Sequence, residues 1–277
     1  MKQLSYNKTI KAIISAALLA TVMLSPTANA DNNLQNIIDN ADHRTPAYKA
    51  RDQYRHPLET LNFFAIKDNM TVVEIFPGGG WYSEILAPYL KDKGSFYASH
   101  NNPDSKREFA RKSAARFKAK MASNDIYSKV NITVLEPPAK TEIAPPGSAD
   151  AVLTFRNIHN WMNAGNADDI FAAMYKALKP GGILGIVEHR GNSNTKQDPK
   201  ARSGYVNQAH AIKLAEKAGF QFVASSEINA NPKDSKDHPK GVWTLPPSLA
   251  MQDHDRQKYL AIGESDRFTL KFVKPES

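Results

Sequence analysis

The chain has 277 residues, with 36 Lys and Arg against 28 Asp and Glu, and a formal net charge of +8 at pH 7. This excess is too small for the strongly basic surface of a nucleic-acid-binding protein, so we expect no nucleic-acid partner. The chain contains no cysteine, which excludes disulfides, thiolate metal sites and a cysteine nucleophile.

The first thirty residues have the three parts of a secretory signal peptide. Lys2, Lys8 and Lys11 precede an apolar run over 12–24, and the small residues Ala28 and Ala30 follow it. The alternative is a membrane anchor, but the apolar run is shorter than the about 20 residues that a spanning helix needs. We therefore predict cleavage after Ala30 and a periplasmic or secreted protein that keeps no stable membrane insertion.

Helical and strand patterns then alternate along residues 31–277, which we expect to form one domain. Residues 31–68 are predicted to be helical, and the β-branched run 71–76 is predicted to be a buried strand. Further strands are expected at 95–99, 131–135, 149–155, 183–188, 220–225 and 268–273, and helices at 82–90, 105–121, 164–178 and 207–218. Apolar strands separated by helices indicate a parallel sheet covered on both faces. Residues 226–266 are expected to be an inserted loop with little regular structure.

Three consecutive glycines, Gly78, Gly79 and Gly80, separate the first strand from the following helix. A simple turn needs one glycine, whereas a glycine run at this place lets a ligand approach the backbone and the helix N-terminus. In an open parallel sheet, ligands bind beyond the carboxyl ends of the strands. The sequence therefore predicts a ligand site at this edge.

The segment 74–83, together with 151–155 and 178–182, resembles the class I methyltransferases that use S-adenosylmethionine (SAM), over roughly residues 47–275. Residues 52–57 leading into 74–82 look like an exported bacterial family of predicted methyltransferases. The resemblance implies a Rossmann-like fold: a mostly parallel seven-stranded sheet with helices on both faces and an antiparallel last strand. It also implies SAM as cofactor and methyl transfer to a small-molecule substrate in the cell envelope.

The resemblance places Glu74 near the methionine part of SAM, and Gly78, Gly79 and Gly80 in the loop that approaches the cofactor. Phe76 replaces the usual first glycine of that loop. His100, followed by Asn102, stands where these enzymes usually carry an acid that holds both ribose hydroxyls. A histidine does not offer the two anionic acceptors of a carboxylate.

The resemblance also places the loop after the fourth strand, with Arg156, Asn157 and His159, beside the methyl group and its acceptor. His159 is a candidate general base, because its ordinary pKa lies near neutrality; alternatively, it caps the following helix. The remaining candidates for the acceptor side or a lid are Tyr54, Arg55, His56, Trp81, Tyr82, His189 and Trp243.

The polar residues at the predicted strand ends allow two interpretations. His100, His159 and His189 follow predicted strand ends, and with Glu188 they are possible metal ligands. No closely spaced histidine pair supports a metal site, so a polar pocket without metal is preferred.

Two other functions also remain open. One is a non-catalytic small-molecule-binding protein on the same fold, which the lack of a SAM supply outside the cytoplasm favours. The other is a nicotinamide-dependent oxidoreductase, although the glycines lack G-x-G-x-x-G spacing. The sequence has no pattern that fixes the oligomeric state.

Overall fold

The computed structural model describes residues 27–276, so the greater part of the predicted signal peptide lies outside the described residues. The first helix, α1 (Thr27–Asn40), begins before the predicted cleavage point after Ala30. Leu34 and Ile38 lie one turn apart on this helix, and both are buried in a hydrophobic core cluster. In the described part of the chain, no helix is long and apolar enough to cross a membrane.

Three short helices follow: α2 (Pro46–Lys49), α3 (Asp52–Arg55) and α4 (Pro57–Phe63). The break between α3 and α4 falls at His56, whose φ of 40° is left-handed. Pro57 is the cause, since a proline disfavours the α conformation in the residue before it. The predicted helical region 31–68 is therefore α1 followed by three short helices.

The sheet has the predicted architecture. Its strands are β1 (Thr71–Ile75), β2 (Ser95–His100), β3 (Val130–Val134), β4 (Ala149–Phe155), β5 (Leu178–His189), β6 (Gln221–Ser226) and β7 (Arg267–Val273). They form one seven-stranded sheet in the order β3-β2-β1-β4-β5-β7-β6. Strands β1 to β5 pair in parallel, and β7 runs antiparallel between β5 and β6. The strand order reverses between β1 and β4, where ligands are expected.

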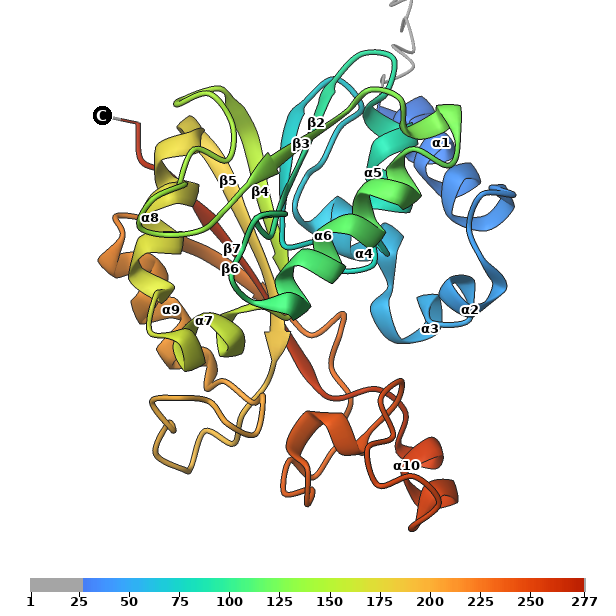
Figure 1. Ribbon diagram of the computed structural model, residues 1–277, viewed down its shortest axis with the longest axis vertical. Helices are drawn as coiled ribbons and strands as arrows, with labels where there is room; N and C mark the ends of the chain where they lie inside the picture. Colours follow the sequence, from blue (N-terminus) through green and yellow to red (C-terminus); the bar gives the residue numbers. More distant parts are fainter. Residues whose placement is uncertain (1–26, 277) are drawn as a thin grey trace, which may run out of the picture.

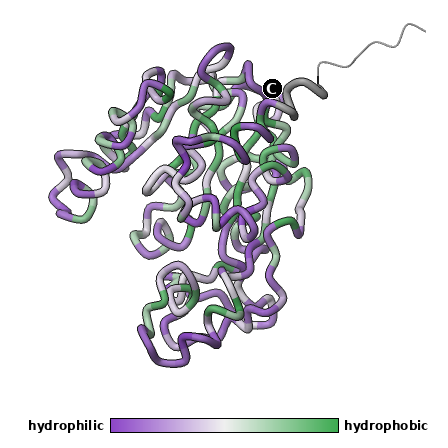
Figure 2. The backbone as a smooth tube through the Cα atoms, turned by 90° about the vertical axis from the view of Figure 1, so that its right-hand side faces the viewer, coloured by the Kyte–Doolittle hydropathy of each residue, from purple (hydrophilic) through white to green (hydrophobic). Residues whose placement is uncertain are grey.

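Helices cover both faces of the sheet, as Figure 1 shows. One face packs against α1, α4, α5 (Ser83–Leu90) and α6 (Glu108–Met121), and the other against α7 (Ile158–Ala164), α8 (Ala167–Ala177) and α9 (Gln208–Lys217). Hydrophobic positions, green in Figure 2, follow the strands through the middle of the molecule.

One sequence expectation about these helices is wrong. The sequence pattern predicts that the helix at 105–121 has Phe109, Phe117 and Met121 on its apolar side. In the structure, Phe109 is 76% exposed, whereas Phe117 and Met121 are buried. The helix expected at 164–178 is confirmed as α8; α7, a short helix that the sequence did not predict, precedes it and ends before Gly165, which is left-handed with φ of 76°. Strand β5 then starts at Leu178, directly after α8.

The insertion between β6 and β7 lies beyond the carboxyl edge of the parallel strands, at the bottom of Figure 1. It contains a short 3-10 helix, η2 (Gly241–Thr244), and α10 (Arg256–Ile262), so it has more regular structure than expected. Asn229 ties it to the rest of the molecule, since its amide donates to the hydroxyls of Thr60 and Thr269. The insertion therefore covers the same edge as the glycine run.

Candidate functional site

The glycine loop after β1 is partly covered. Gly78 and Gly80 have φ of 61° and 81°, a region that side chains disfavour. A methyl group added at Gly79 would lie 2.5 Å from the Tyr48 hydroxyl, and one added at Gly80 would lie 3.2 Å from the Phe117 ring. At Gly78 it would meet nothing within 4 Å. The open approach to this loop is therefore at Gly78.

Glu74, the fourth residue of β1, is a fully buried carboxyl beside this loop. The Ser83 hydroxyl donates to its Oε2 at 2.6 Å. Burial raises the pKa of Glu74 to about 7, against the lowering effects of Ser83 and of the guanidinium groups of Arg156 and Arg55. Such a carboxyl is stabilised in its charged form when a cationic group binds next to it.

His100 ends β2 at the position expected to meet a ribose, and both of its ring nitrogens are already bonded. Nδ1 accepts the backbone N–H of Asn101 at 2.7 Å, so Nε2 carries the proton and donates to the Gly78 carbonyl at 3.2 Å. Burial lowers the pKa of His100, and its ring packs on that of Phe117. The neutral imidazole positions the glycine loop and has no free acceptor for a hydroxyl.

Asn102 is also engaged, because its amide donates to Glu136 Oε2 at 2.6 Å. The pKa of Glu136 lies below its ordinary value, mainly through this bond. Glu136 was not among the sequence candidates, although it follows the predicted third strand; its carboxylate lies beside the end of β2 through its bond to Asn102. Its position after a predicted strand end was the available signal.

Asn157 joins the ends of the two central strands. Its amide donates to the Ile75 carbonyl at 2.9 Å, to the Thr154 hydroxyl at 3.2 Å and to the Phe76 carbonyl at 3.5 Å. The predicted catalytic Asn157 thus holds β1 and β4 together at the point where the strand order reverses.

His159 and Glu188 form a buried pair. Glu188 is fully buried at the end of β5, and its carboxylate accepts the backbone N–H groups of Ile158 at 2.6 Å and His189 at 2.8 Å. Its Oε1 lies 3.1 Å from Nδ1 of His159. Because the carboxylate is the acceptor, Nδ1 carries the proton and Nε2 of His159 remains basic. Glu188 thus caps α7, the role considered for His159, and leaves the histidine able to accept a proton.

The structure brings together three of the four metal-ligand candidates, His159, Glu188 and His189, with one possible ligand atom of each within 4.8 Å of the others. His100 lies elsewhere, bonded to Gly78. Nδ1 of His189 is already bonded to the Ser265 hydroxyl at 2.5 Å. Burial, His159 and the nearby arginines hold the pKa of His189 well below its ordinary value, so its imidazole is neutral.

A cavity of about 260 Å³ opens beside this pair. The insertion supplies Trp243, which is 39% exposed and lies edge-on to the His159 ring with 5.9 Å between ring centroids. The other lining residues are Arg156, His159, Asn160, His189, Val242, Pro246, Pro247, Ser248, Ser265 and Arg267. The sequence candidates Arg156, His159, His189 and Trp243 therefore share one cavity.

The N-terminal candidates lie around this cavity rather than on it. Arg55 is buried over the Trp81 ring, 4.6 Å from its centroid. Tyr82 stacks on Phe155, with ring centroids 3.6 Å apart; burial raises its pKa to about 12. Tyr54 and His56 line a second cavity of about 180 Å³, on the side of Glu264 and Ser265.

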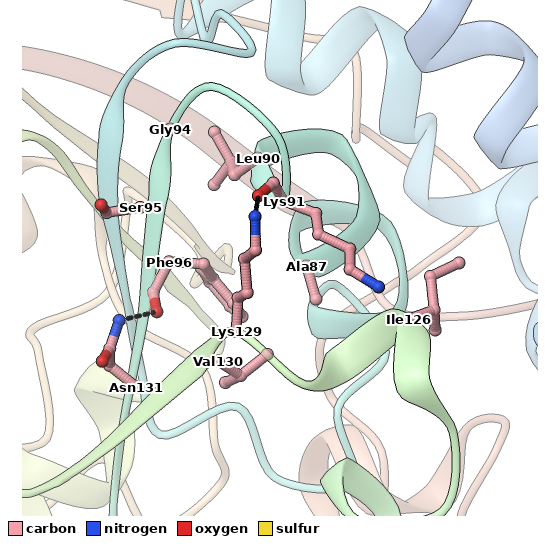
Figure 3. A pocket seen from close by; sticks show the side chains of 10 residues that line it. All are labelled: Ala87, Leu90, Lys91, Gly94, Ser95, Phe96, Ile126, Lys129, Val130 and Asn131. Atoms are coloured by element: carbon pink, nitrogen blue, oxygen red, sulfur yellow. Dashed lines mark hydrogen bonds between the residues drawn. The ribbon is translucent and has the colours of Figure 1, made fainter.

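A further cavity, of about 230 Å³, lies at the opposite edge of the sheet (Figure 3). It is lined near the amino ends of β2 and β3, where Lys129 donates to the Lys91 carbonyl and Asn131 to the Phe96 carbonyl. This edge is the wrong end for a ligand of an open parallel sheet, so we do not include it in the candidate site.

Solved structures with the same fold are mostly methyltransferases. A SAM-dependent methyltransferase from Aquifex aeolicus is 16% identical, with a TM-score of 0.53 over 88% of this chain and 98% of its own. A structure of SAM-dependent methyltransferases from Methanosarcina mazei has 12% sequence identity and a TM-score of 0.51, and the match covers 78% of this chain and 98% of that chain. The [4+2]-cyclase SpnF has 13% sequence identity and a TM-score of 0.57, and the match covers 91% of this chain and 94% of that chain. No family model and no curated protein matches the sequence. The chain therefore has the class I methyltransferase fold.

Proposed function

We propose that this chain is a SAM-dependent methyltransferase that acts on a small-molecule acceptor. The observation that carries the proposal is Glu74, a buried carboxyl near the end of β1 whose charge interacts with the guanidinium groups of Arg156 and Arg55. SAM ends in an ammonium and a carboxylate, which match one acid and an adjacent guanidinium. Arg55 is 3% exposed, and its Nη1 has no hydrogen-bond partner among the described residues. The residues present fit the methionine end of SAM.

In this proposal, Glu74 holds the ammonium of SAM, Arg55 holds its carboxylate, and Gly78 gives the backbone approach. Glu136 and Asn102 meet the ribose side in place of the usual acid, and Gly79, Gly80 and His100 position the loop. SAM supplies an activated methyl group. Such a reaction depends mostly on how the two reactants are positioned, and a basic nitrogen that removes the acceptor's proton adds to the rate.

The proton-accepting group in this proposal is Nε2 of His159. Glu188 fixes the ring through Nδ1 and stabilises the imidazolium that forms when a proton is taken up. Arg156 and Asn157 act beside it: Arg156 lines the acceptor cavity, and Asn157 holds the strand ends. His189 and Trp243 complete the walls.

We also propose that the protein is exported, on the strength of the pattern in residues 1–30. Sequencing of the N-terminus of the protein isolated from the cell envelope tests this. An N-terminus at Asp31 is expected, whereas an intact Met1 in protein recovered from the cytoplasm contradicts export.

The alternative is a non-catalytic small-molecule-binding protein. One observation favours it: both ring nitrogens of His100 are used within the protein. Incubation of the purified protein with methyl-labelled SAM and an envelope extract separates the two functions. We expect a labelled small molecule with the natural protein and at least 100-fold less with His159→Gln. SAM-independent binding of an extract component with no labelled product would support the alternative.

A further inference from the structure

We infer that the cavity under Trp243 binds the oxyanion group, a carboxylate or a phosphate, of an anionic acceptor through Arg156 and Arg267. The anion site stands on geometry alone. Its assignment to the methyl acceptor rests on the proposed function.

The charges around this cavity do not balance. Glu264 is 2% exposed and pairs with three arginines: Arg51 at 2.5 Å, Arg55 at 3.5 Å and Arg267. Arg156 lies close enough to this group for mutual repulsion, yet no carboxylate lies within salt-bridge distance of it in the described part of the chain. Four guanidinium groups thus lie around one ion-paired carboxylate, Glu264, and the other nearby acid is the buried Glu74, whose charge interacts with those of Arg55 and Arg156.

Arg267 has one buried donor without a partner beside this cavity. Its Nη1 donates to the Tyr54 carbonyl at 2.9 Å, and its Nη2 donates to Glu264. Its Nε is buried and has no partner among the described residues, although the side chain is 2% exposed and lines the cavity. A buried donor without a partner costs free energy that a bound acceptor recovers.

Arg156 contributes the larger unsatisfied charge. Its backbone has a left-handed φ of 61°, and its N–H donates to the Val187 carbonyl at 2.7 Å, which fixes where the side chain leaves the β4 end. Within residues 27–276, its guanidinium makes no hydrogen bond, although it lines the cavity. A planar guanidinium with free donors matches the two oxygens of a carboxylate or a phosphate.

The remaining walls define the rest of the ligand. Val242, Trp243, Pro246 and Pro247 are apolar, and His159 and Ser265 are polar. With about 260 Å³, the cavity is smaller than most drug-sized sites. A small organic anion fits this combination: its charged end meets the two arginines, and its other end meets Trp243 and His159. This places a nucleophilic atom of the ligand on the side of the basic His159 nitrogen.

The test is calorimetric titration of the processed full chain with inorganic phosphate and, separately, with malonate, at an ionic strength held constant with sodium chloride. We expect saturable binding of at least one of them. Arg156→Gln should weaken it at least tenfold and Arg156→Lys less. The control Arg202→Gln, a side chain that is 75% exposed and pairs with Asp198, should leave it unchanged. No binding of either anion, or equal loss in the control, overturns the inference.

A second measurement does not depend on the variants folding. In the unmodified protein labelled with ¹⁵N-arginine, the Nε signals of the site arginines should shift in step with the titration. Absence of any Nε shift during saturable binding overturns the site.

A repeat of the titration with SAM present separates this inference from the proposed function. Independent binding of SAM and the anion supports the assignment of the anion site to the methyl acceptor. Competition between SAM and the anion would mean that Arg156 binds the cofactor, and it would overturn that assignment. Arg156-dependent anion binding in a protein that binds no SAM contradicts the methyltransferase proposal and the acceptor assignment, and confirms the anion site itself.

Discussion

The carboxylate of Glu188 lies 3.1 Å from Nδ1 of His159 and also accepts the backbone N–H of Ile158 at 2.6 Å. One buried side chain at the end of β5 thus caps α7 and fixes the proton on one nitrogen of a histidine from that helix. Both elements adjoin the cavity, so the same carboxylate stabilises the structure of the site and sets which nitrogen of His159 carries the proton.

Replacement of Glu188 by Gln tests this relationship. The amide lacks the charge that stabilises a protonated His159, so we expect labelled-methyl transfer to fall about 10²- to 10⁴-fold. The free energy of unfolding should fall by about 1–3 kcal/mol, because the N–H groups lose a charged acceptor. Glu227→Gln, at a side chain that is 65% exposed, is the control. Unchanged transfer in a folded Glu188→Gln variant would rule out the dyad.

Glu74 should make stability depend on pH in the direction opposite to most carboxyl groups. Its pKa in the folded protein, about 7, is above its ordinary value of 4.5, so its favourable contribution is complete below pH 4.5 and is lost as the pH rises through 7. The loss amounts to about 3 kcal/mol. Urea unfolding of the natural protein and Glu74→Gln at pH 5 and 8.5 should show the variant gaining relative stability at the higher pH. The idea fails if the difference between them is the same at both pH values.

The contribution of Glu264 to stability should depend on pH in the direction opposite to that of Glu74. Its arginine partners hold its pKa far below the ordinary range despite its burial, so the stability that it provides is present above that range and is lost on acidification. Glu264→Gln leaves Arg51, Arg55 and Arg267 without their anion, and we expect a loss of about 3–5 kcal/mol at pH 7 in urea unfolding. A change below 1 kcal/mol would show that these arginines are neutralised elsewhere.

Substitutions of His100 test whether the ribose of SAM lies at the end of β2. His100→Asp restores the carboxylate that most enzymes of this fold use, so we expect SAM to bind about tenfold more tightly, since bonds to a charged acceptor contribute about 1.5–3 kcal/mol. His100→Asn is the matched control, because it lacks the charge and should give no gain. Calorimetric titration of SAM measures both. Equal affinity in the two variants would mean that the ribose lies away from the end of β2.

The fold was largely predictable from local patterns. The apolar run 149–155 coincides with β4, and the run 71–76 contains β1, because strands buried on both faces are continuously apolar. Local patterns failed at Phe109, where helical spacing alone does not say which side faces the core, and before Gly165, where the short helix α7 was not predicted.

The candidate site was predictable only in part. The strand-end rule brought Arg156, His159 and His189 to one cavity, since parallel strands end at the same edge. Contacts over long sequence separations were not visible: Arg51 and Glu264 are 213 positions apart, and no short motif joins them. The bonds of His100 to Gly78 and of Asn102 to Glu136 depend on the tertiary structure in the same way.

The central claim, that this site binds SAM, is tested most directly by calorimetric titration of SAM and its demethylated product into the processed protein at pH 6 and pH 8. We predict binding of both at micromolar to submillimolar concentrations, tighter at pH 8 because Glu74 is then ionised, and at least tenfold weaker in Glu74→Gln at pH 8. No binding of either compound at millimolar concentration would contradict the claim and leave only the fold in common with the methyltransferases.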